Sequence, residues 1–358
     1  MTILSFLILL AGTIGWFLLP LIPAIRELVA PVDVAPLEVV GRDAGDVAFF
    51  ARGFRRYMTG QLDGLQPGLP PEYLGRLPDG TLFARVTSMV DTLARGAEEN
   101  GAHDRLMLLE KATVLEGGEM FLREVYGRSD ILGGPDAAYR ALLGDGSISL
   151  GERSRVLRWV HAVGPLIVGA GSSLLGRVSS DTSVLLGRGT LVERVGAPVI
   201  RTAERTEPRL ALERERADGE SRMFELPVGS RQIGNHLRIE GDLELPWHTV
   251  METNLVVAGT LQVGPRARIQ GNVKAHGDVV TERGSRITGS LVGRAAVTLG
   301  EDASVGGPII AEGPLEIRSG VTIGAPDALT TISAPSLKLG LGVTIHGQIV
   351  ARDGVRVV

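Results

Sequence analysis

An 18-residue repeat begins at Leu237 and runs through the C-terminal part of the chain. Aliphatic residues return at the first, seventh and fifteenth places of each unit, and small or β-branched residues return at the thirteenth. Repetition at a fixed period predicts a solenoid, in which each unit is one turn that contacts only its neighbours. The apolar places are separated by two or by multiples of six, which favours three short strands per turn. The fold class we predict is therefore an all-β solenoid, a three-sided parallel β-helix in which each repeat forms one turn.

The inward places of these units define a predicted core of aliphatic side chains: Leu243, Leu261, Ile269, Val279, Ile287, Val297, Leu315, Ile323, Leu337 and Ile345. Glycine recurs two residues ahead of an aliphatic, at predicted corners where positive φ or close backbone approach requires it: Gly259, Gly271, Gly277, Gly289, Gly313 and Gly347. A short insertion over 327–330 interrupts the repeat, which resumes at Thr331. Trp247 is the only aromatic residue between Glu225 and Val358, so we expect an interior too narrow for Phe.

The same register starts at Leu142, Val160 and Val178, which predicts three earlier turns over 142–195. An interruption rich in Arg and Glu follows over 196–236, and we interpret it as a solvated surface excursion that is part helix. The bulk of the β-helix then occupies 237–358.

The first residues form a long apolar run. Residues 3–25 carry no charge and are long enough to cross a hydrocarbon layer of about 30 Å. This predicts a transmembrane anchor over 1–26 that binds membrane lipid, with a cleaved signal peptide as the alternative. Arg26 and Arg42 follow the run, so the positive-inside rule places the bulk of a single-pass membrane protein in the cytoplasm.

A linker over 27–42 and a small helical or mixed adapter domain over 43–141 are expected next. Residues Asp43 to Leu62 predict an amphipathic helix, and a second helix is expected near Thr81–Asn100. Arg52, Arg55 and Arg56 lie off the apolar face of the first helix and are expected to be solvated or to touch anionic headgroups. That apolar face consists of Val47, Phe50, Phe54, Met58 and Leu62.

Composition excludes several functions. The chain has 358 residues with 37 Lys and Arg against 41 Asp and Glu, so it lacks the excess of basic residues that is typical of nucleic-acid-binding proteins. It has no cysteine, which excludes disulfides, thiolate zinc sites, iron–sulfur clusters and a cysteine nucleophile. No motif for a metal, cofactor or catalytic nucleophile stands out, and we expect no cofactor and no enzyme activity.

Three segments share the form small–x–[IV]–x–G–x–[LIV]: ARIQGNV over 267–273, ASVGGPI over 303–309 and VTIHGQI over 343–349. These segments resemble the bactofilins, a family of bacterial polymer-forming cytoskeletal proteins. The resemblance covers the repeats over 237–358, or over 142–358 at most, and not the N-terminal part. It implies a right-handed β-helix whose subunits stack end to end, without nucleotide, at the membrane. The apolar run, the adapter domain and the interruption depart from the family pattern.

Two other functions remain open. The segments VGAGSS, LGEDAS and LGERSR also resemble left-handed β-helix acyltransferases, which use a histidine as general base. His248, His276 and His346 have no carboxylate at a fixed short spacing, so we expect exposed corner histidines. The third interpretation is a membrane-tethered spacer or binding module.

The C-terminal end stops without a polar cap or a following helix. A solenoid end exposes open strand edges and a cross-section of the core. We therefore expect the last turn to pair tail to tail with another subunit through Ile349, Val355 and Val357, giving a homo-oligomer or polymer. The adapter domain is expected to cover the other end. The client proteins cannot be named from the sequence.

Overall fold

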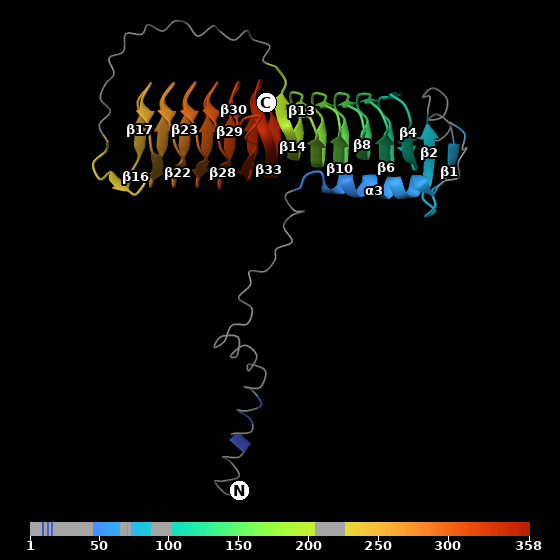
Figure 1. Cartoon of the computed structure of the whole chain (residues 1–358), viewed down its shortest axis with the longest axis horizontal. Helices are drawn as coiled ribbons and strands as arrows, with labels where there is room; N and C mark the ends of the chain where they lie inside the picture. Colours follow the sequence, from blue (N-terminus) through green and yellow to red (C-terminus); the bar gives the residue numbers. More distant parts are fainter. Residues whose placement is uncertain are drawn as a thin grey trace. The chain divides into compact units, whose positions relative to one another are not determined.

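The computed structural model describes residues 9–10, 13, 16, 46–64, 70, 73–86, 102–204 and 226–358. The chain divides into two units, Met1–Asp46 and Val47–Val358, and the second holds every described strand (Figure 1). The predicted membrane span and linker lie outside the described residues, apart from helical positions at Leu9, Leu10, Thr13 and Trp16. In the part of the chain described, no helix is both long and apolar enough to cross a bilayer.

The second unit is a parallel β-solenoid of about 13 turns. Successive turns pair in the register of the sequence repeat, as in Leu255 with Val273 and Val273 with Leu291. Each turn contributes strands to three faces, which we call A, B and C. The three-sided parallel β-helix predicted from the repeat is confirmed, whereas its handedness stays a prediction.

The first solenoid runs from β2 to β14. Face A holds β2 (Leu82–Val86), β4 (Leu106–Leu109) and the second halves of β6 (Met120–Gly127), β8 (Ala138–Gly144), β10 (Arg155–Ala162) and β12 (Ser173–Ser180). Face B holds β5 (Thr113–Leu115), β7 (Ile131–Gly133), β9 (Ile148–Leu150), β11 (Leu166–Val168) and β13 (Ser183–Leu186). Face C holds β3 (Ala102–His103) and the first halves of β6, β8, β10 and β12. The last strand, β14 (Leu191–Thr202), crosses all three faces.

The second solenoid runs from β16 to β33. Face A holds β16 (His236–Ile239), β19 (Asn254–Val257), β22 (Val273–Ala275), β25 (Leu291–Gly293), β28 (Ile309–Ala311) and β31 (Thr330–Ala334). Face B holds β18 (Val250–Met251), β21 (Arg268–Ile269), β24 (Arg286–Ile287), β27 (Ser304–Val305) and β30 (Thr322–Ile323). Face C holds β17 (Leu243–Leu245), β20 (Leu261–Val263), β23 (Val279–Thr281), β26 (Val297–Leu299), β29 (Leu315–Ile317) and β32 (Leu337–Leu339). The last strand, β33 (Thr344–Val357), again crosses all three faces.

The predicted core and corners of the second solenoid are confirmed in the structure. All ten predicted core residues are buried. A Cβ at any of the six predicted corner glycines would collide with the turn before it, and Gly347 also has positive φ. The register after the insertion is wrong by one residue, because Ile332 and not Thr331 pairs with Ile309 and points inward.

The boundary predicted at residue 142 is wrong, because turns of the first solenoid already occupy 102–141. β3 and β4 pair in parallel with β6, and β6 pairs with β8. The pairing of β6 with β8 contains a bulge after Phe121, and the step from Ala138 to its partner Arg155 is one position shorter than the repeat. These irregularities break the period that identifies the later turns.

The expectation of an interior too narrow for Phe applies to the second solenoid, whereas the first solenoid has aromatic side chains in its interior. Phe121 and Tyr139 are buried on consecutive turns and stack with ring centroids 5.1 Å apart. Space for the Tyr139 hydroxyl exists because position 133 is glycine, where any Cβ would touch that oxygen.

The interruption predicted over 196–236 is shorter in the structure, because its first seven residues belong to β14. Residues 205–225, which hold most of the Arg and Glu, lie outside the described part. Near its end, β15 (Arg231–Ile233) forms an antiparallel hairpin with β16.

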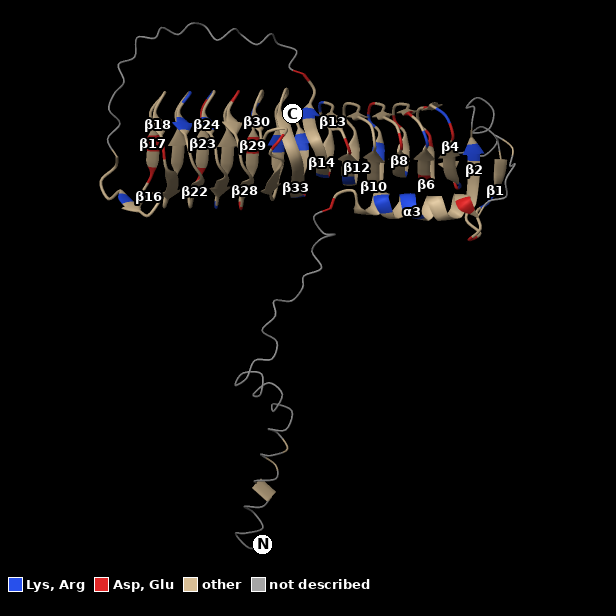
Figure 2. Cartoon of the chain, viewed as in Figure 1, with Lys and Arg blue, Asp and Glu red and all other residues tan. Residues whose placement is uncertain are grey.

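One helix, α3 (Phe49–Asp63), packs against face A of the first solenoid. Its Ala51 and Met58 are buried, as predicted for an amphipathic helix, but Phe50 is half exposed. The arginines of α3 are blue in Figure 2. The second predicted helix is wrong over 82–86, where the chain forms β2. β2 in turn pairs with β1 (Tyr73–Arg76) as an antiparallel hairpin.

Candidate functional site: two ends and an internal junction

The two solenoids meet end to end inside the chain. Strand β14 pairs antiparallel with β33 along three faces, with Val192 opposite Val355, Val195 opposite Ile349, and Arg201 opposite Thr344. Both strands are the last of their solenoids, so the junction joins one C-terminal end to the other. Figure 1 shows the two strands side by side at the middle of the solenoid.

Hydrogen bonds between the two solenoids stabilise the junction at its edges. The Val357 N–H donates to the Thr190 carbonyl at 3.0 Å, and the Val357 carbonyl accepts from the Gly189 N–H at 2.9 Å. The buried Thr202 hydroxyl donates to the Gly340 carbonyl at 2.8 Å and accepts from the Val343 N–H at 2.9 Å. Thr202 thus satisfies two buried backbone groups of the opposite solenoid, which would otherwise cost about 1–3 kcal/mol each.

The prediction that Ile349, Val355 and Val357 form an edge open to another subunit is wrong. All three are at most 1% exposed, and β14 occupies the edge beside them. The physical reason is that the chain contains a second solenoid end of the same kind. Pairing within one chain proceeds at a far higher effective concentration than pairing between chains.

The N-terminal end of the first solenoid is covered only in part, on face A, by a hairpin and not by a separate domain; among the described residues no strand pairs with the outer edges of β3 and β5. Strand β1 occupies the outer edge of β2. On the adjoining face, the Arg55 guanidinium of α3 donates to Asp145 at 2.7 Å, and the Tyr126 hydroxyl donates to the same carboxylate at 2.6 Å. Burial, followed by the bond to Asp145, raises the pKa of Tyr126 to about 12.

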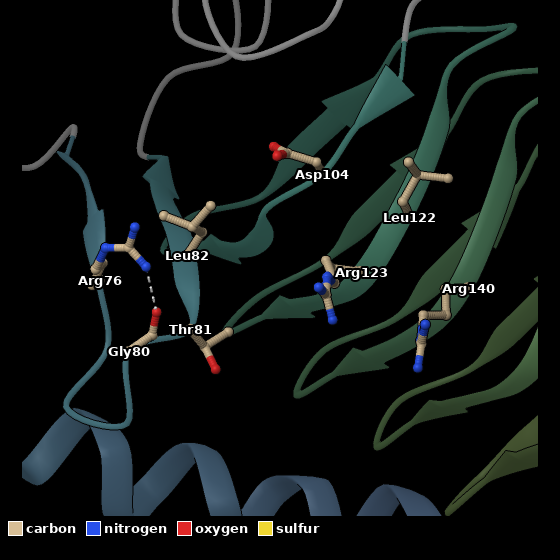
Figure 3. Close-up of a pocket in the computed structure, with 8 residues that line it drawn as sticks. All are labelled: Arg76, Gly80, Thr81, Leu82, Asp104, Leu122, Arg123 and Arg140. Carbon is tan, nitrogen blue, oxygen red and sulfur yellow. Dashed lines mark hydrogen bonds between the residues drawn. The ribbon is translucent and has the colours of Figure 1, made fainter.

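A hollow of about 660 Å³ lies beside this covered end (Figure 3). Three arginines line it, together with Asp104. Arg76 already donates to the Gly80 carbonyl at 3.0 Å, and Arg140 pairs with Glu124 at 3.1 Å. Arg123 has no such contact in the described part of the chain. Among its described lining residues there is no histidine, serine or pair of carboxylates.

The three histidines singled out from the sequence do not come together. His248 and His276 are exposed on corners, as expected, and His276 lies 3.4 Å from an Arg294 nitrogen. His346 differs from the expectation, because it is buried at the junction with its Nδ1 3.2 Å from the Pro198 carbonyl. Among the described residues, no group of three or more His, Asp or Glu could hold a metal ion.

The second solenoid begins with an incompletely covered turn. β15 covers the edge of β16 on face A, but no described strand pairs with the outer edges of β17 and β18. Within β17, the Leu243 N–H and the Leu245 carbonyl bond to the next turn, so the alternating backbone directs the N–H and C=O of Glu244 outward. The N–H and C=O of Val250 in β18 also point outward, because the carbonyls of Thr249 and Met251 accept hydrogen bonds from the next turn. We call this edge of β17 and β18 the open end.

One buried cluster beneath α3 was not predicted from the sequence. On face A, His161 is 3% exposed, its Nδ1 lies 2.9 Å from the Ser179 hydroxyl, and its Nε2 lies 3.7 Å from Asp181. Burial lowers the pKa of His161, the Asp181 carboxylate opposes this shift, and Arg55 and Arg52 reinforce it. His161 and Ser179 are one repeat apart and pair in consecutive turns, so the register of the sequence could have placed them together; it does not reveal that they are buried.

The lowered pKa of His161 predicts how the stability of the fold depends on pH. Its lowered pKa means that the folded state holds the ring neutral while the unfolded state binds a proton below about pH 6.5. The unfolding free energy should therefore be highest above that pH and fall as the pH decreases toward the folded pKa. Urea titrations between about pH 7.5 and about pH 5.5 measure this loss. His161→Gln cannot bind the proton, so its stability should change less over this range; an equal slope would contradict the assignment.

No family model, curated protein or solved structure matches this chain.

Proposed function

We propose that this protein is a structural scaffold, a β-solenoid that self-associates through its open end without nucleotide. The observation that carries the proposal is the unpaired outer edge of β17 and β18. Unpaired strand edges recruit further strands, and soluble proteins normally cover them. Trp247 and Val250 add exposed apolar surface beside this edge, being 42% and 48% exposed.

The junction within the chain supports this form of association. It demonstrates that the terminal turn of one solenoid in this chain fits the terminal turn of another by antiparallel pairing. The same kind of pairing between the open ends of two chains would cover both edges at once. Two chains would then lie in line, joined through their open ends; at the other end β1 covers the edge of β2 alone, and β3 and β5 have no described partner on their outer side.

The resemblance to the bactofilins agrees with a non-enzymatic, nucleotide-free scaffold. Residues 3–25 would tether it to the membrane, with the solenoid in the cytoplasm available to client proteins. At about 4.8 Å per turn, the 13 turns extend roughly 60 Å, enough to act as a spacer as well as a building block.

Glu244→Pro tests the proposal. Proline removes the N–H that faces the open end and leaves the bonds of Leu243 and Leu245 to the next turn intact. We expect the in-line dimer to weaken by at least tenfold, as measured by sedimentation velocity of the full-length chain over a range of concentrations. The thermal unfolding midpoint should be nearly unchanged.

Glu244→Ala is the matched control, because it removes the same side chain and retains the N–H. It should associate as the unmodified chain does. Equal association of the proline variant would show that the open end is not the contact. A monomer at all concentrations in the unmodified chain would favour a tethered spacer or binding module.

A further inference from the structure

A continuous row of outward side chains follows face B through the whole second unit. In the first solenoid the strand register aligns Val114, Leu132, Ser149, Ile167 and Leu185. The four aliphatic members are 61%, 46%, 43% and 37% exposed. We call these five residues the apolar ladder. Four exposed aliphatic side chains aligned in one row, interrupted only by Ser149, favour an interaction surface over scattered exposure.

The same row becomes polar where it enters the second solenoid. The register continues from Leu185 through Arg201 and Thr344, and then along β30, β27, β24, β21 and β18. The outward residues there are Thr322, Ser304, Arg286, Arg268 and Val250. At this position the first solenoid has four aliphatic residues and Ser149, whereas the second has four polar residues and Val250.

Face A of the first solenoid shows what apolar outward residues can bind. There Tyr126 and Leu143 point outward, and α3 packs over them with Ala51 and Met58. Within the described part of the chain, no helix packs over the apolar ladder on face B, since α3 packs with the face A cluster. A group that binds the apolar ladder must therefore be something other than α3.

The apolar ladder is complementary to itself. Ser149 is its central member, with two larger aliphatic residues on each side. When one copy is turned over a two-fold axis beside Ser149, Val114 faces Leu185 of the other copy and Leu132 faces Ile167. Isologous contacts of this kind are the commonest basis of homodimers. Two sheets packing face to face at about 10 Å bring such side chains into contact.

We propose that the apolar ladder binds the apolar ladder of a second copy of this chain, with the two solenoids side by side and antiparallel. The antiparallel direction follows from charge. A parallel arrangement would place the Arg268 and Arg286 side chains of one copy against the same arginines of the other, which is unfavourable. In the antiparallel arrangement, the two second solenoids point away from each other.

This lateral contact goes beyond the end contact and uses a different face. One chain then has two ways to bind a copy of itself, in line through the open end and sideways through face B. Together they build a row of chains with alternating end and side contacts, whereas either alone builds a pair.

The absence of cysteine from the chain allows a direct test. Ser149→Cys in the full-length chain places one thiol at the proposed axis, where a short bifunctional maleimide should join two copies. Thr322→Cys, on the same face of the second solenoid, is the matched control and should give at least tenfold less dimer. Val114→Cys should give little dimer alone and abundant dimer when mixed with Leu185→Cys.

Equal cross-linking of the Ser149→Cys and Thr322→Cys chains would overturn the proposal. Strong cross-linking of Val114→Cys to itself would overturn the antiparallel direction. Leu132→Glu, which changes an exposed residue, should abolish the Ser149→Cys dimer. Adding Glu244→Pro should leave that dimer unchanged, so the failure of one contact can be distinguished from the failure of the other.

Discussion

Replacing Val355 with Glu should destabilise the solenoid by about 4 kcal/mol or more. Val355 is fully buried between β32 and β14, where its backbone pairs with Leu337 on one side and Val192 on the other. A carboxylate there has no partner, so it must either stay charged without hydration or take up a proton. Chemical denaturation of the full-length chain, followed by circular dichroism, measures the loss.

The control is Arg356→Glu, which changes the exposed neighbour of Val355 on the same strand. This variant should stay within about 0.5 kcal/mol of the unmodified chain. If Val355→Glu were instead as stable as the control and only reduced association, the C-terminal turn would be an intersubunit edge and the internal junction would be wrong.

Gly347→Ala should be the second most damaging single change, at about 3 kcal/mol. Gly347 has φ +126°, a backbone conformation that residues with a Cβ rarely adopt. A Cβ at this position would also collide with the Thr330 backbone of the preceding turn. Both costs arise in the folded state, so the urea midpoint should fall.

Gly241→Ala provides the comparison, because it too precedes an aliphatic core residue by two positions. No atom lies within 4 Å of a Cβ built there, since this glycine is in the first complete turn of the second solenoid. We expect its urea midpoint to be unchanged within error. Similar losses in both variants would indicate that the effect belongs to glycine in general and not to the close approach of turns.

The sequence predicts the second solenoid well because its repeat is a local property. Residues one repeat apart, such as Leu243 and Leu261, pair in consecutive turns, so periodicity alone places them. In the first solenoid the register predicted from Leu142 onward is confirmed by the pairing of Leu142, Val160 and Val178. Prediction fails before residue 142, where bulges and shortened steps shift the register and Phe121 and Tyr139 replace aliphatic residues. The space for the Tyr139 hydroxyl depends on Gly133 in another strand, which a periodic pattern does not reveal.

The junction could not be predicted for a different reason. Thr202 and Gly340 are 138 positions apart and belong to different solenoids, so no repeat relates them. An uncapped C-terminal turn indicates only that an edge needs a partner. Which partner occupies it depends on the ends that the folded chain makes available.

The antiparallel junction also reverses the direction in which the strands wind, halfway along the second unit. Each solenoid begins at an outer end and finishes in the middle, so the strands of the two halves wind toward each other. Most cytoskeletal filaments grow from one kind of end and shrink from the other because their subunits all point the same way. Because both proposed contacts join like to like, an assembly built through them would have strands winding in both directions and no plus or minus end.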